Sequence, residues 1–398
     1  MQESARRPSA VRPLRIGVYD TLDKANRYRR SGILRFASGH PDLHIVLRQE
    51  KNLLDDFADN GAGFHREHLD GVIVNNNGFV QHERKPQSIP IACTCFDPNA
   101  SDKRVADVNI NLDNAALARA AADLLLKRGH VNFAYVHTPL PMERPYSQLR
   151  AETFADAVRA KGYACAVYAA GKWRRSEYAN LQRLADWLIN LPKPCAILTY
   201  ADNVAHIVMD ACHFAHLSVP AQISLVGIDN DPEVCDGLQP TLTSLWPDFE
   251  RSGYLAAEAL YNLLRGLPLP SDLTYGVKAI VERASTQDMR GGGRLVARAC
   301  EILRSRSSEH GFRADALAAE LNVSRRLLDR HFREILGHTI HGELERLRLE
   351  TAKRLLAETS DTVFEISEAS GYSTVTAFHN AFAAATGITP GSWRRRSR

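Results

Sequence analysis

Three polar residues, Asp229, Asn230 and Asp231, follow directly after an apolar run, ISLVGI at 223–228. Carboxylates and amides offer several hydrogen-bonding positions, so a buried strand that ends on them can present them to a ligand. Pro232 closes this stretch, and Asp, Asn and Pro are also ordinary turn residues. The sequence therefore allows both a ligand-binding strand end and a plain acidic turn.

The common catalytic and metal-binding patterns are missing. We find no G-x-x-x-x-G-K-[ST], no G-x-G-x-x-G after the first expected strand, no H-E-x-x-H and no G-x-S-x-G. His65-x-x-His68 and His213-x-x-His216 have no second pair of ligands nearby, and the seven cysteines are scattered. We expect no catalytic residues, no metal, no cofactor and free thiols. An enzyme without a common motif remains an alternative.

The net charge is concentrated in the last quarter of the chain. Residues 291–398 hold 17 Lys and Arg against 13 Asp and Glu, which accounts for the whole net charge of +4. Sixteen of those 17 cations are arginine. An arginine-rich module attached to a neutral body is typical of nucleic-acid binding.

The first 285 residues alternate between β-rich runs and helical patterns. Strands are predicted at 15–20, 44–49, 71–76, 89–95, 132–138, 165–170, 196–201 and 224–229. Helices are predicted at 114–128, 147–161 and 202–216, with Asp113 or Asn114 as the N-cap of the first. This alternation indicates parallel sheets covered on both faces, and the number of units indicates two lobes with a cleft between them. Ligands of such sheets bind at the carboxyl ends of the strands.

The last hundred residues are helical and contain a repeat. Phe332, Gly337 and Thr339 recur 50 residues later as Phe382, Gly387 and Thr389. Each copy shows a short helix, a turn and a second helix, which is the helix-turn-helix pattern.

The expected turn and cap residues differ between the two copies. Asn322 and Ser324 serve the first, and Gly371 with Ser373 or Thr374 serves the second. A connecting helix carries one apolar line, made of Ile340, Leu344, Leu347, Thr351 and Leu355. Its 18 or so residues span roughly 27 Å, near the spacing of about 34 Å between successive major grooves.

Residues 292–396 closely resemble the DNA-binding domain of the AraC/XylS family of transcription regulators, including the closing pattern GITPGSWRRR at 387–396. By position in the motif, the first recognition helix faces base edges with Arg325, Arg326, Asp329 and Arg330. Arginine suits guanine O6 and N7, and Asp suits a cytosine amino group. The alternative is that some of these residues only touch phosphate, or that Asp329 orients Arg330.

The second recognition helix is less basic than in many family members. There the corresponding residues are Val375, Thr376 and Asn380, with Val375 suited to a thymine methyl and Asn380 to adenine. We therefore expect the first helix to carry most of the sequence specificity. Arg394 and Arg395 are expected to contact phosphate or to form a solvated tail.

The N-terminal part resembles a type I periplasmic-binding-protein fold, as used by the sensor domains of LacI/GalR-type repressors. The resemblance rests on 110–136, 149–158, 196–212 and 223–231. A two-lobed α/β sensor followed by an all-α double helix-turn-helix domain resembles the regulators of xylose operons. The implied domains are an effector-binding domain at 14–286, a linker at 287–293 and a DNA-binding domain at 294–396.

The resemblance also implies the effector contacts, residue by residue. Asp229 would accept sugar hydroxyls, and Arg150 would donate two N–H groups to neighbouring oxygens. Asp113 and Asp202 occupy matching loop positions, although either can be a helix cap instead. Asn230 and Asp231 then serve the turn.

Two further contacts follow from the same resemblance. Trp173 would stack on an apolar sugar face, or is an ordinary surface or core aromatic, and Asn26 would close the other lobe. Two departures, Ala201 in place of a polar residue and a basic loop DTLDKANRYRR at 20–30, leave a different pentose or an acidic ligand open.

The resemblance implies a sugar-responsive transcription regulator. We expect double-stranded DNA half-sites, a sugar effector such as D-xylose, a homodimer, a contact with RNA polymerase, and activation rather than repression. With no apolar run of about 18 residues and no signal peptide, we expect a cytoplasmic protein without a membrane partner. The alternatives are a sugar-modifying enzyme fused to a DNA-binding module and a constitutive DNA-binding protein whose α/β part only dimerises.

Overall fold

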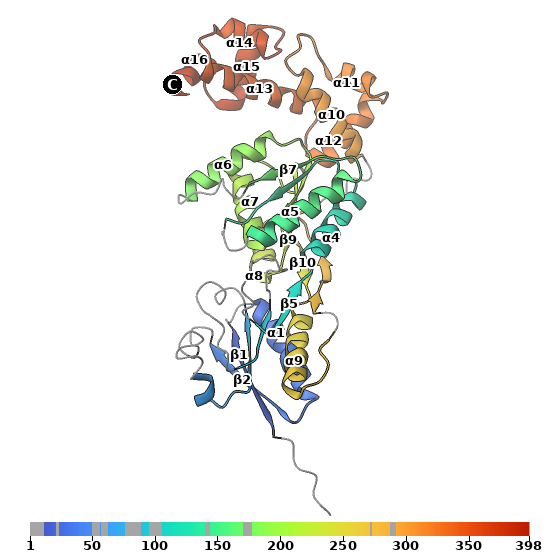
Figure 1. The fold of residues 1–398 in the computed structure, drawn as a ribbon. Coiled ribbons are helices and arrows are strands. Elements are labelled where there is room, and N and C mark those ends of the chain that lie inside the picture. The colour runs from blue at the N-terminus through green and yellow to red at the C-terminus, as the bar shows by residue number, and fades with distance from the viewer. Residues whose placement is uncertain are drawn as a thin grey trace, which may run out of the picture.

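The computed structural model describes residues 12–20, 24–49, 56, 63–75, 89–94, 106–139, 144–169, 177–270, 273–286 and 292–397. Trp173 and residues 287–291 of the predicted linker lie outside these ranges. Two α/β lobes are followed by a helical domain, which contacts the second lobe at the end away from the first (Figure 1). No helix in the described ranges is long and apolar enough to cross a membrane.

Lobe 1 is a parallel sheet in the strand order β11-β5-β4-β3-β1-β2. The strands are β1 (Leu14–Asp20), β2 (Leu43–Gln49), β3 (Gly71–Asn75), β4 (Ile91–Thr94), β5 (Val108–Leu112) and β11 (Thr274–Tyr275). Helices α1 (Lys24–Ser38) and α9 (Phe249–Arg265) pack against each other, and α9 also covers β3, β4 and β5.

Lobe 2 is a second sheet in the order β12-β10-β9-β8-β6-β7, parallel except for β12 at its edge. Its strands are β6 (Phe133–Val136), β7 (Cys165–Tyr168), β8 (Cys195–Thr199), β9 (Ile223–Ile228), β10 (Thr243–Pro247) and β12 (Val277–Val281). Its helices are α4 (Asn114–Lys127), α5 (Arg144–Arg159), α6 (Glu177–Asn190), α7 (Asp202–Phe214) and α8 (Pro232–Cys235).

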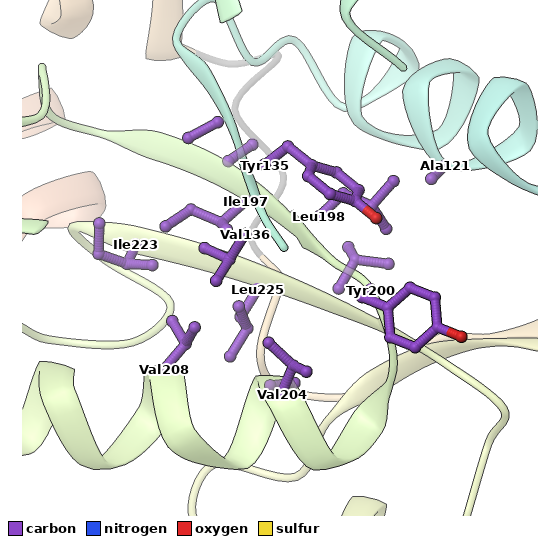
Figure 2. Close-up of a cluster of buried hydrophobic side chains, with 14 of the residues drawn as sticks. Ala121, Tyr135, Val136, Ile197, Leu198, Tyr200, Val204, Val208, Ile223 and Leu225 are labelled. Carbon is purple, nitrogen blue, oxygen red and sulfur yellow. The ribbon is translucent and has the colours of Figure 1, made fainter. Parts of the chain in front are cut away.

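The core of lobe 2 explains why β9 is a continuous apolar run. Every residue of Ile223–Ile228 is buried, because helices cover both faces of the sheet. Figure 2 shows Val204 and Val208 of α7 on one side of the central strands and Ala121 of α4 on the other.

The chain passes from one lobe to the other three times, directly after β5, β10 and β11. These connections are hydrogen-bonded to one another, since the Asp113 N–H donates to the Tyr275 carbonyl and the Asp248 N–H to the Gly276 carbonyl, both at 2.9 Å. The lobes are therefore joined by three adjacent, hydrogen-bonded segments.

All eight predicted strands are present, several with shorter bounds, but four strands were missed. These are β5, β10, β11 and β12. In β5 two asparagines interrupt the apolar pattern (VNINL), and β10 ends on a proline. Strand β11 has only two residues, and β12 is an antiparallel strand at the edge of its sheet. Tertiary pairing makes these segments strands although their own residues signal it weakly.

The C-terminal domain has seven helices in its described residues, 292–397. They are α10 (Gly293–Arg306), α11 (Ala314–Glu320), α12 (Arg325–Leu336), α13 (Ile340–Glu358), α14 (Val363–Ala369), α15 (Val375–Thr386) and α16 (Pro390–Ser397). Two separate apolar clusters form, one around α10–α12 and one around α14–α16.

Helix α13 connects these two clusters, as predicted, but not with a single apolar face. Ile340, Leu344 and Leu347 belong to the first cluster, whereas Ala352 and Leu356 belong to the second. The predicted Thr351 and Leu355 are only half-buried. The buried face changes position because each half of the helix packs on a different helix-turn-helix unit.

Candidate functional site

The end of β9 has an unusual backbone conformation. Asp229 has φ 109° and Asn230 has φ 52°, in the region that non-glycine residues rarely adopt. Asp229 is half-buried, and its N–H donates to the Leu245 carbonyl at 2.9 Å. Asp231 caps α8 by accepting from the Glu233 N–H, and Pro232 occupies the first helical turn. Strain of this kind is characteristic of functional positions.

Arg150 is a buried guanidinium held in place by two neighbours. It is 5% exposed, its Nε donates to Asn114 Oδ1 at 2.7 Å, and its Nη1 donates to the Tyr200 carbonyl at 2.5 Å. The guanidinium carbon lies 4.6 Å from the centre of the Tyr200 ring. Among the described residues, Nη2 has no hydrogen-bond partner, so the planar group is fixed with donor capacity remaining.

Asn114 was considered only as a helix cap, but it positions Arg150. It is buried, and its Nδ2 donates to the Leu112 carbonyl at 3.2 Å, which leaves Oδ1 directed to the guanidinium. Asp113 is the N-cap of α4, accepting from the Ala116 N–H at 2.7 Å, as the capping alternative predicted. The sequence feature that could have indicated this role is the position of Asn114 next to the N-cap Asp113, where the chain passes from lobe 1 to lobe 2 after β5.

Asp202 supports the turn after β9 from inside lobe 2. Its Oδ1 accepts from the Ser244 hydroxyl and its Oδ2 from the Asp231 N–H, both at 2.7 Å, and the Cys235 thiol also donates to Oδ2. Burial raises the pKa of Asp202 to about 6. Both carboxylate oxygens of this 2% exposed residue are thus bonded within lobe 2, where they hold the turn after β9; the effector contact stays a prediction.

The alternative that Asp202 is an N-cap is wrong, because Ala201 occupies that position and Asp202 is the first residue of α7. Asn26, the residue predicted to close the other lobe, is 1% exposed on α1 and accepts from Arg29 Nη1 at 2.8 Å. Its amide oxygen is therefore bonded to a side chain of its own helix.

Lys24, which the sequence analysis did not single out, connects the two lobes electrostatically. Burial lowers the pKa of Lys24, while Asp231, Asp202 and Asp229 of lobe 2 act in the opposite direction. Its Nζ lies 5.7 Å from the ring centre of Trp246 at the end of β10. The sequence feature that could have indicated Lys24 is the basic character of the loop at 20–30.

The first helix-turn-helix has the predicted caps. Asn322 adopts φ 53° in the turn, and the Ser324 hydroxyl accepts from the Leu327 N–H at 3.2 Å. Helix α12 buries Leu328, Phe332, Ile335 and Leu336, which leaves Arg325, Arg326 and Arg330 exposed on the other side. Arg325 pairs with Asp315 at 3.0 Å, and Arg330 lies 3.7 Å from Glu334.

Asp329 does not share that exposed face. Its side chain is 17% exposed, and its Oδ1 accepts from the Ile340 N–H at 3.1 Å, at the start of α13. Its Oδ2 lies 3.6 Å from Arg325 Nε, so its partner is Arg325 rather than the expected Arg330. The carboxylate therefore holds the junction of α12 and α13, and base recognition by Asp329 stays a prediction.

The second helix-turn-helix repeats this design with fewer charges. Thr374 caps α15 by accepting from the Ala377 N–H at 3.1 Å, while Phe378 and Phe382 are buried. Thr376 and Asn380 are exposed, and Val375 is half-buried.

The two terminal arginines differ in their surroundings. Arg394 is half-buried and donates from Nη2 to the Asp361 carbonyl, in the loop before α14. Arg395 is exposed and donates to Ser392 Oγ at 3.1 Å. Arg394 therefore anchors α16, which the phosphate and solvated-tail interpretations did not anticipate.

Two conserved domain types match the chain. Residues 122–286 match the periplasmic binding protein-like domain, and residues 317–396 match the helix-turn-helix domain.

Relatives that match most of the chain are known. The xylose operon regulatory protein of Escherichia coli (strain K12) is 30% identical over 288 residues, which cover 72% of this chain and 73% of that protein. The protein of the same name from Haemophilus influenzae is 26% identical over 291 residues, covering 72% and 74%. The solved structure of a xylose-binding transcription activator has the same fold, with a TM-score of 0.57, 24% identity, and coverage of 96% of this chain and 97% of that one.

Proposed function

Because this chain belongs to the family of xylose operon regulatory proteins, and is a DNA-binding transcription regulator with a sugar-binding domain, we propose that its effector is a pentose, with D-xylose as the first candidate. The relatives are regulators and not enzymes, so a sugar-modifying reaction is no longer a competing function.

The fixed guanidinium of Arg150 is the observation that carries the proposal. Arg150 is bonded to the Tyr200 carbonyl just after β8, and Asp229 ends β9, the strand paired with β8. Paired strands lie about 4.8 Å apart, which brings the two groups to the same edge of the sheet. A planar donor beside a carboxylate acceptor suits neighbouring hydroxyl groups, and bonds to charged groups contribute roughly 1.5–3 kcal/mol each.

The other residues of the proposed site have different roles. Asp113 and Lys24 are candidates for the rim of the site, while Asn114 and Asp202 are positioning residues that hold Arg150 and the turn after β9. Asn26 and Trp173 remain proposals on the resemblance alone.

For the DNA-binding domain, we propose that exposed residues of α12 and α15 contact bases in two successive major grooves. These are Arg325, Arg326 and Arg330 of α12, with Val375, Thr376 and Asn380 of α15. Arg395 is proposed to contact phosphate, and Arg394 to stabilise α16 beside it. Helix α13, with 19 residues, is about 28 Å long and so matches the groove spacing approximately.

At the level of the assembly, we propose a homodimer that binds repeated half-sites and activates transcription through RNA polymerase. A pentose that binds the closed arrangement of the lobes more tightly than the open one shifts the dimer toward it.

Calorimetric titration with aldopentoses, hexoses and sugar acids tests the effector proposal. D-Xylose should bind stoichiometrically without turnover, and Asp229→Ala and Arg150→Ala should each weaken binding at least about tenfold. Asp156→Ala is the matched control, because Asp156 is a 73% exposed carboxylate on α5 of the same lobe. Wild-type affinity in both site variants, with unchanged melting temperatures, would reject the assignment.

A further inference from the structure

A cavity lies between lobe 2 and the DNA-binding domain, away from the proposed pentose site. Its volume is about 780 Å³, within the range of about 300–1,000 Å³ usual for small-molecule sites. Lobe 2 contributes residues that precede β6, β7 and β8, at the amino ends of the strands. The DNA-binding domain contributes one face of α10. The lining residues are Val131, Asn132, Gly162, Tyr163, Ala164, Pro192, Lys193, Arg294, Ala297, Arg298, Cys300, Glu301, Arg304 and Ser305.

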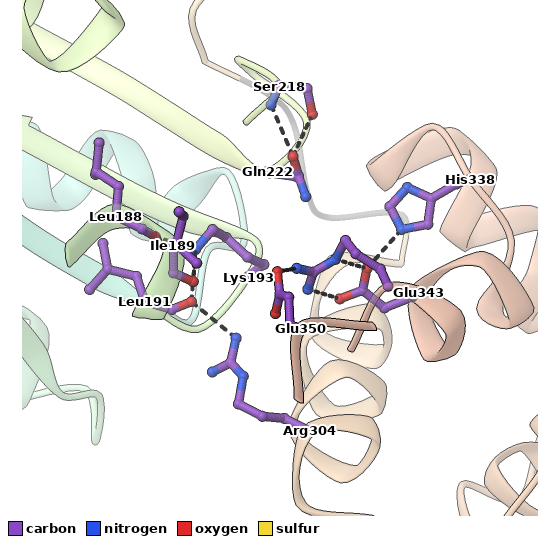
Figure 3. Close-up of polar contacts among 11 residues, drawn as sticks. Leu188, Ile189, Leu191, Lys193, Ser218, Gln222, Arg304, His338, Glu343 and Glu350 are labelled. Atoms are coloured by element: carbon purple, nitrogen blue, oxygen red, sulfur yellow. Dashed lines mark hydrogen bonds and ion pairs between the residues drawn. The ribbon is translucent and has the colours of Figure 1, made fainter. Parts of the chain in front are cut away.

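The charges of this lining are unbalanced. Among the described residues that line it, four are cationic and only Glu301 is acidic, and Glu301 is already paired with Arg298 at 2.6 Å. Arg294 and Arg304 have no ion pair with any described carboxylate. Arg304 instead donates from Nη2 to the Leu191 carbonyl at 3.0 Å, which is a direct contact between the two domains (Figure 3).

Lys193 adds a buried positive charge at the wall of the cavity. It is 3% exposed, and its Nζ donates to the carbonyls of Leu188, Ile189 and Leu191 at 2.5, 3.3 and 2.8 Å (Figure 3). Burial, with a smaller contribution from Arg304, lowers the pKa of Lys193 to about 8, while the Cys195 sulfur acts in the opposite direction. Lys193, Arg294 and Arg304 thus carry like charges here, and Glu301, the acidic residue among the described lining residues, is paired with Arg298 instead.

We propose that this cavity is a binding site for a small anion that carries a phosphate group, bonded by Arg294 and Arg304 and attracted by the charge of Lys193. Lys193 supplies charge alone, because its three N–H donors are used by carbonyl oxygens. Arginine is the side chain best suited to phosphate oxygens, through parallel N–H donors.

The position of the cavity gives the anion a consequence for regulation. Residues from lobe 2 and from α10 both line it, so an anion bonded by Arg294 and Arg304 of α10 is also attracted by Lys193 of lobe 2. An anion that binds one arrangement of the domains better stabilises that arrangement, and thereby changes DNA affinity independently of the pentose. The proposed anion site is independent of the proposed pentose site, because none of the residues that line the cavity lies at the carboxyl ends of the strands.

The test is calorimetric titration of the full-length protein at constant ionic strength. The probes are inorganic phosphate, pyrophosphate and ribose 5-phosphate, with ribose as the neutral comparison. We expect the phosphate-bearing probes to bind with one site per chain and ribose not to compete for it. Stronger binding of ribose 5-phosphate than of pyrophosphate would identify a sugar phosphate as the ligand class, and the reverse order would identify a free polyphosphate.

Two variants and one control decide whether this cavity is the site. Arg294→Gln and Arg304→Gln should each weaken the tightest probe at least about tenfold, the effect of losing one charge-assisted bond. Arg183→Gln removes the same charge from an exposed position of α6 outside the cavity and should leave binding unchanged. Melting temperatures and D-xylose affinity of all three should match the wild type.

Three results would overturn the proposal. The first is that none of the phosphate-bearing probes binds the wild-type protein at a probe concentration of about 10 mM. A dissociation constant above this value would be too weak for a specific site. The second is equal binding by the wild type and both cavity variants. The third is displacement of pyrophosphate by an unrelated DNA duplex whose own affinity falls in the same variants, since that would assign the two arginines to the DNA backbone.

Discussion

Single polar residues in this protein hold neighbouring elements in register, and Asp329 is the clearest case. It lies on the recognition helix α12, yet its carboxylate accepts from the Ile340 N–H and so caps the start of α13. Arg326 on the same helix is exposed and has no such contact with any described residue. Similar positions on one helix can therefore serve structure in one case and DNA in the other.

This difference gives a prediction for two variants of α12. Asp329→Ala should destabilise the domain by about 1–2 kcal/mol, the effect of losing a helix-terminal hydrogen bond, and leave the preferred bases unchanged. Arg326→Ala should leave stability within about 0.5 kcal/mol and relax the base preference at one position. Urea unfolding and binding to a randomised operator measure the two effects. A change of base preference in Asp329→Ala would contradict this prediction and would mean that Asp329 takes part in base recognition.

Glu343 is a buried carboxylate on α13 with charged partners. Its oxygens accept from Arg346 at 2.7 and 2.9 Å, and His338 Nε2 lies 3.0 Å away. Burial acts to raise the pKa of Glu343, but these partners outweigh it and hold the pKa at about 2. Because the pKa is lower in the folded state, the contribution to stability is complete above about pH 4.5 and is lost as the pH falls toward 2.

Glu343→Gln should therefore cost about 3 kcal/mol at pH 7 and progressively less below pH 4.5. Glu350→Gln is the control, since Glu350 pairs with the same Arg346 but is 44% exposed, and it should cost less than about 1 kcal/mol. Chemical unfolding at pH 7 and pH 4 measures both. An equal cost for the two variants would show that burial of Glu343 does not strengthen its ion pairs.

At the scale of elements, two left-handed glycines of the second helix-turn-helix unit impose different restrictions. Gly371 has φ 81°, and a Cβ at this position would lie 2.4 Å from the Ser307 carbonyl oxygen at the end of α10. Gly387, at the end of α15, has φ 74° with open space around it. The first glycine thus permits a close approach between elements, and the second only a left-handed helix end.

Gly371→Ala should destabilise the protein more than Gly387→Ala does. The left-handed conformation alone costs roughly 1–2 kcal/mol for alanine, which is the expected effect at Gly387. At Gly371 the carbonyl contact adds to this and should separate the second helix-turn-helix unit from α10. Calorimetric unfolding gives the two values. Equal destabilisation would mean that α10 moves aside at little cost.

At the scale of the whole molecule, the lobes and the DNA-binding domain have separate cores. The clusters around α10–α12 and α14–α16 contain no residue of either lobe. Between lobe 2 and α10 the described hydrogen bond runs from Arg304 to the Leu191 carbonyl, and cavities of about 780 and 400 Å³ lie beside it. A thin polar contact of this kind is typical of domains that move relative to each other.

The fragment 292–398 should therefore fold without the lobes. We expect a helical circular-dichroism spectrum, a cooperative melting transition, and binding of operator DNA that no longer responds to D-xylose. The full-length protein is the comparison. A fragment without a cooperative transition would show that lobe 2 is needed to stabilise α10.

The sequence by itself determined the order of the elements and the type of each domain. Continuous apolar runs such as 223–228 predict buried parallel strands, because both faces of such a strand are covered. The repeat at 50 residues, with Asn322, Ser324 and Thr374 at turns and caps, predicts the paired helix-turn-helix units, because these residues act on their own local backbone.

Only the tertiary structure decided what the polar residues contact. Asp202, Asp329 and Arg394 are bonded to backbone groups of segments distant in the sequence or across a helix junction, which no local pattern reveals. The same holds for Arg150, whose orientation depends on Asn114 and Tyr200 from two other elements. A side chain's role depends on which partners the fold brings within about 3 Å, and that is a property of packing between elements rather than of spacing along the chain.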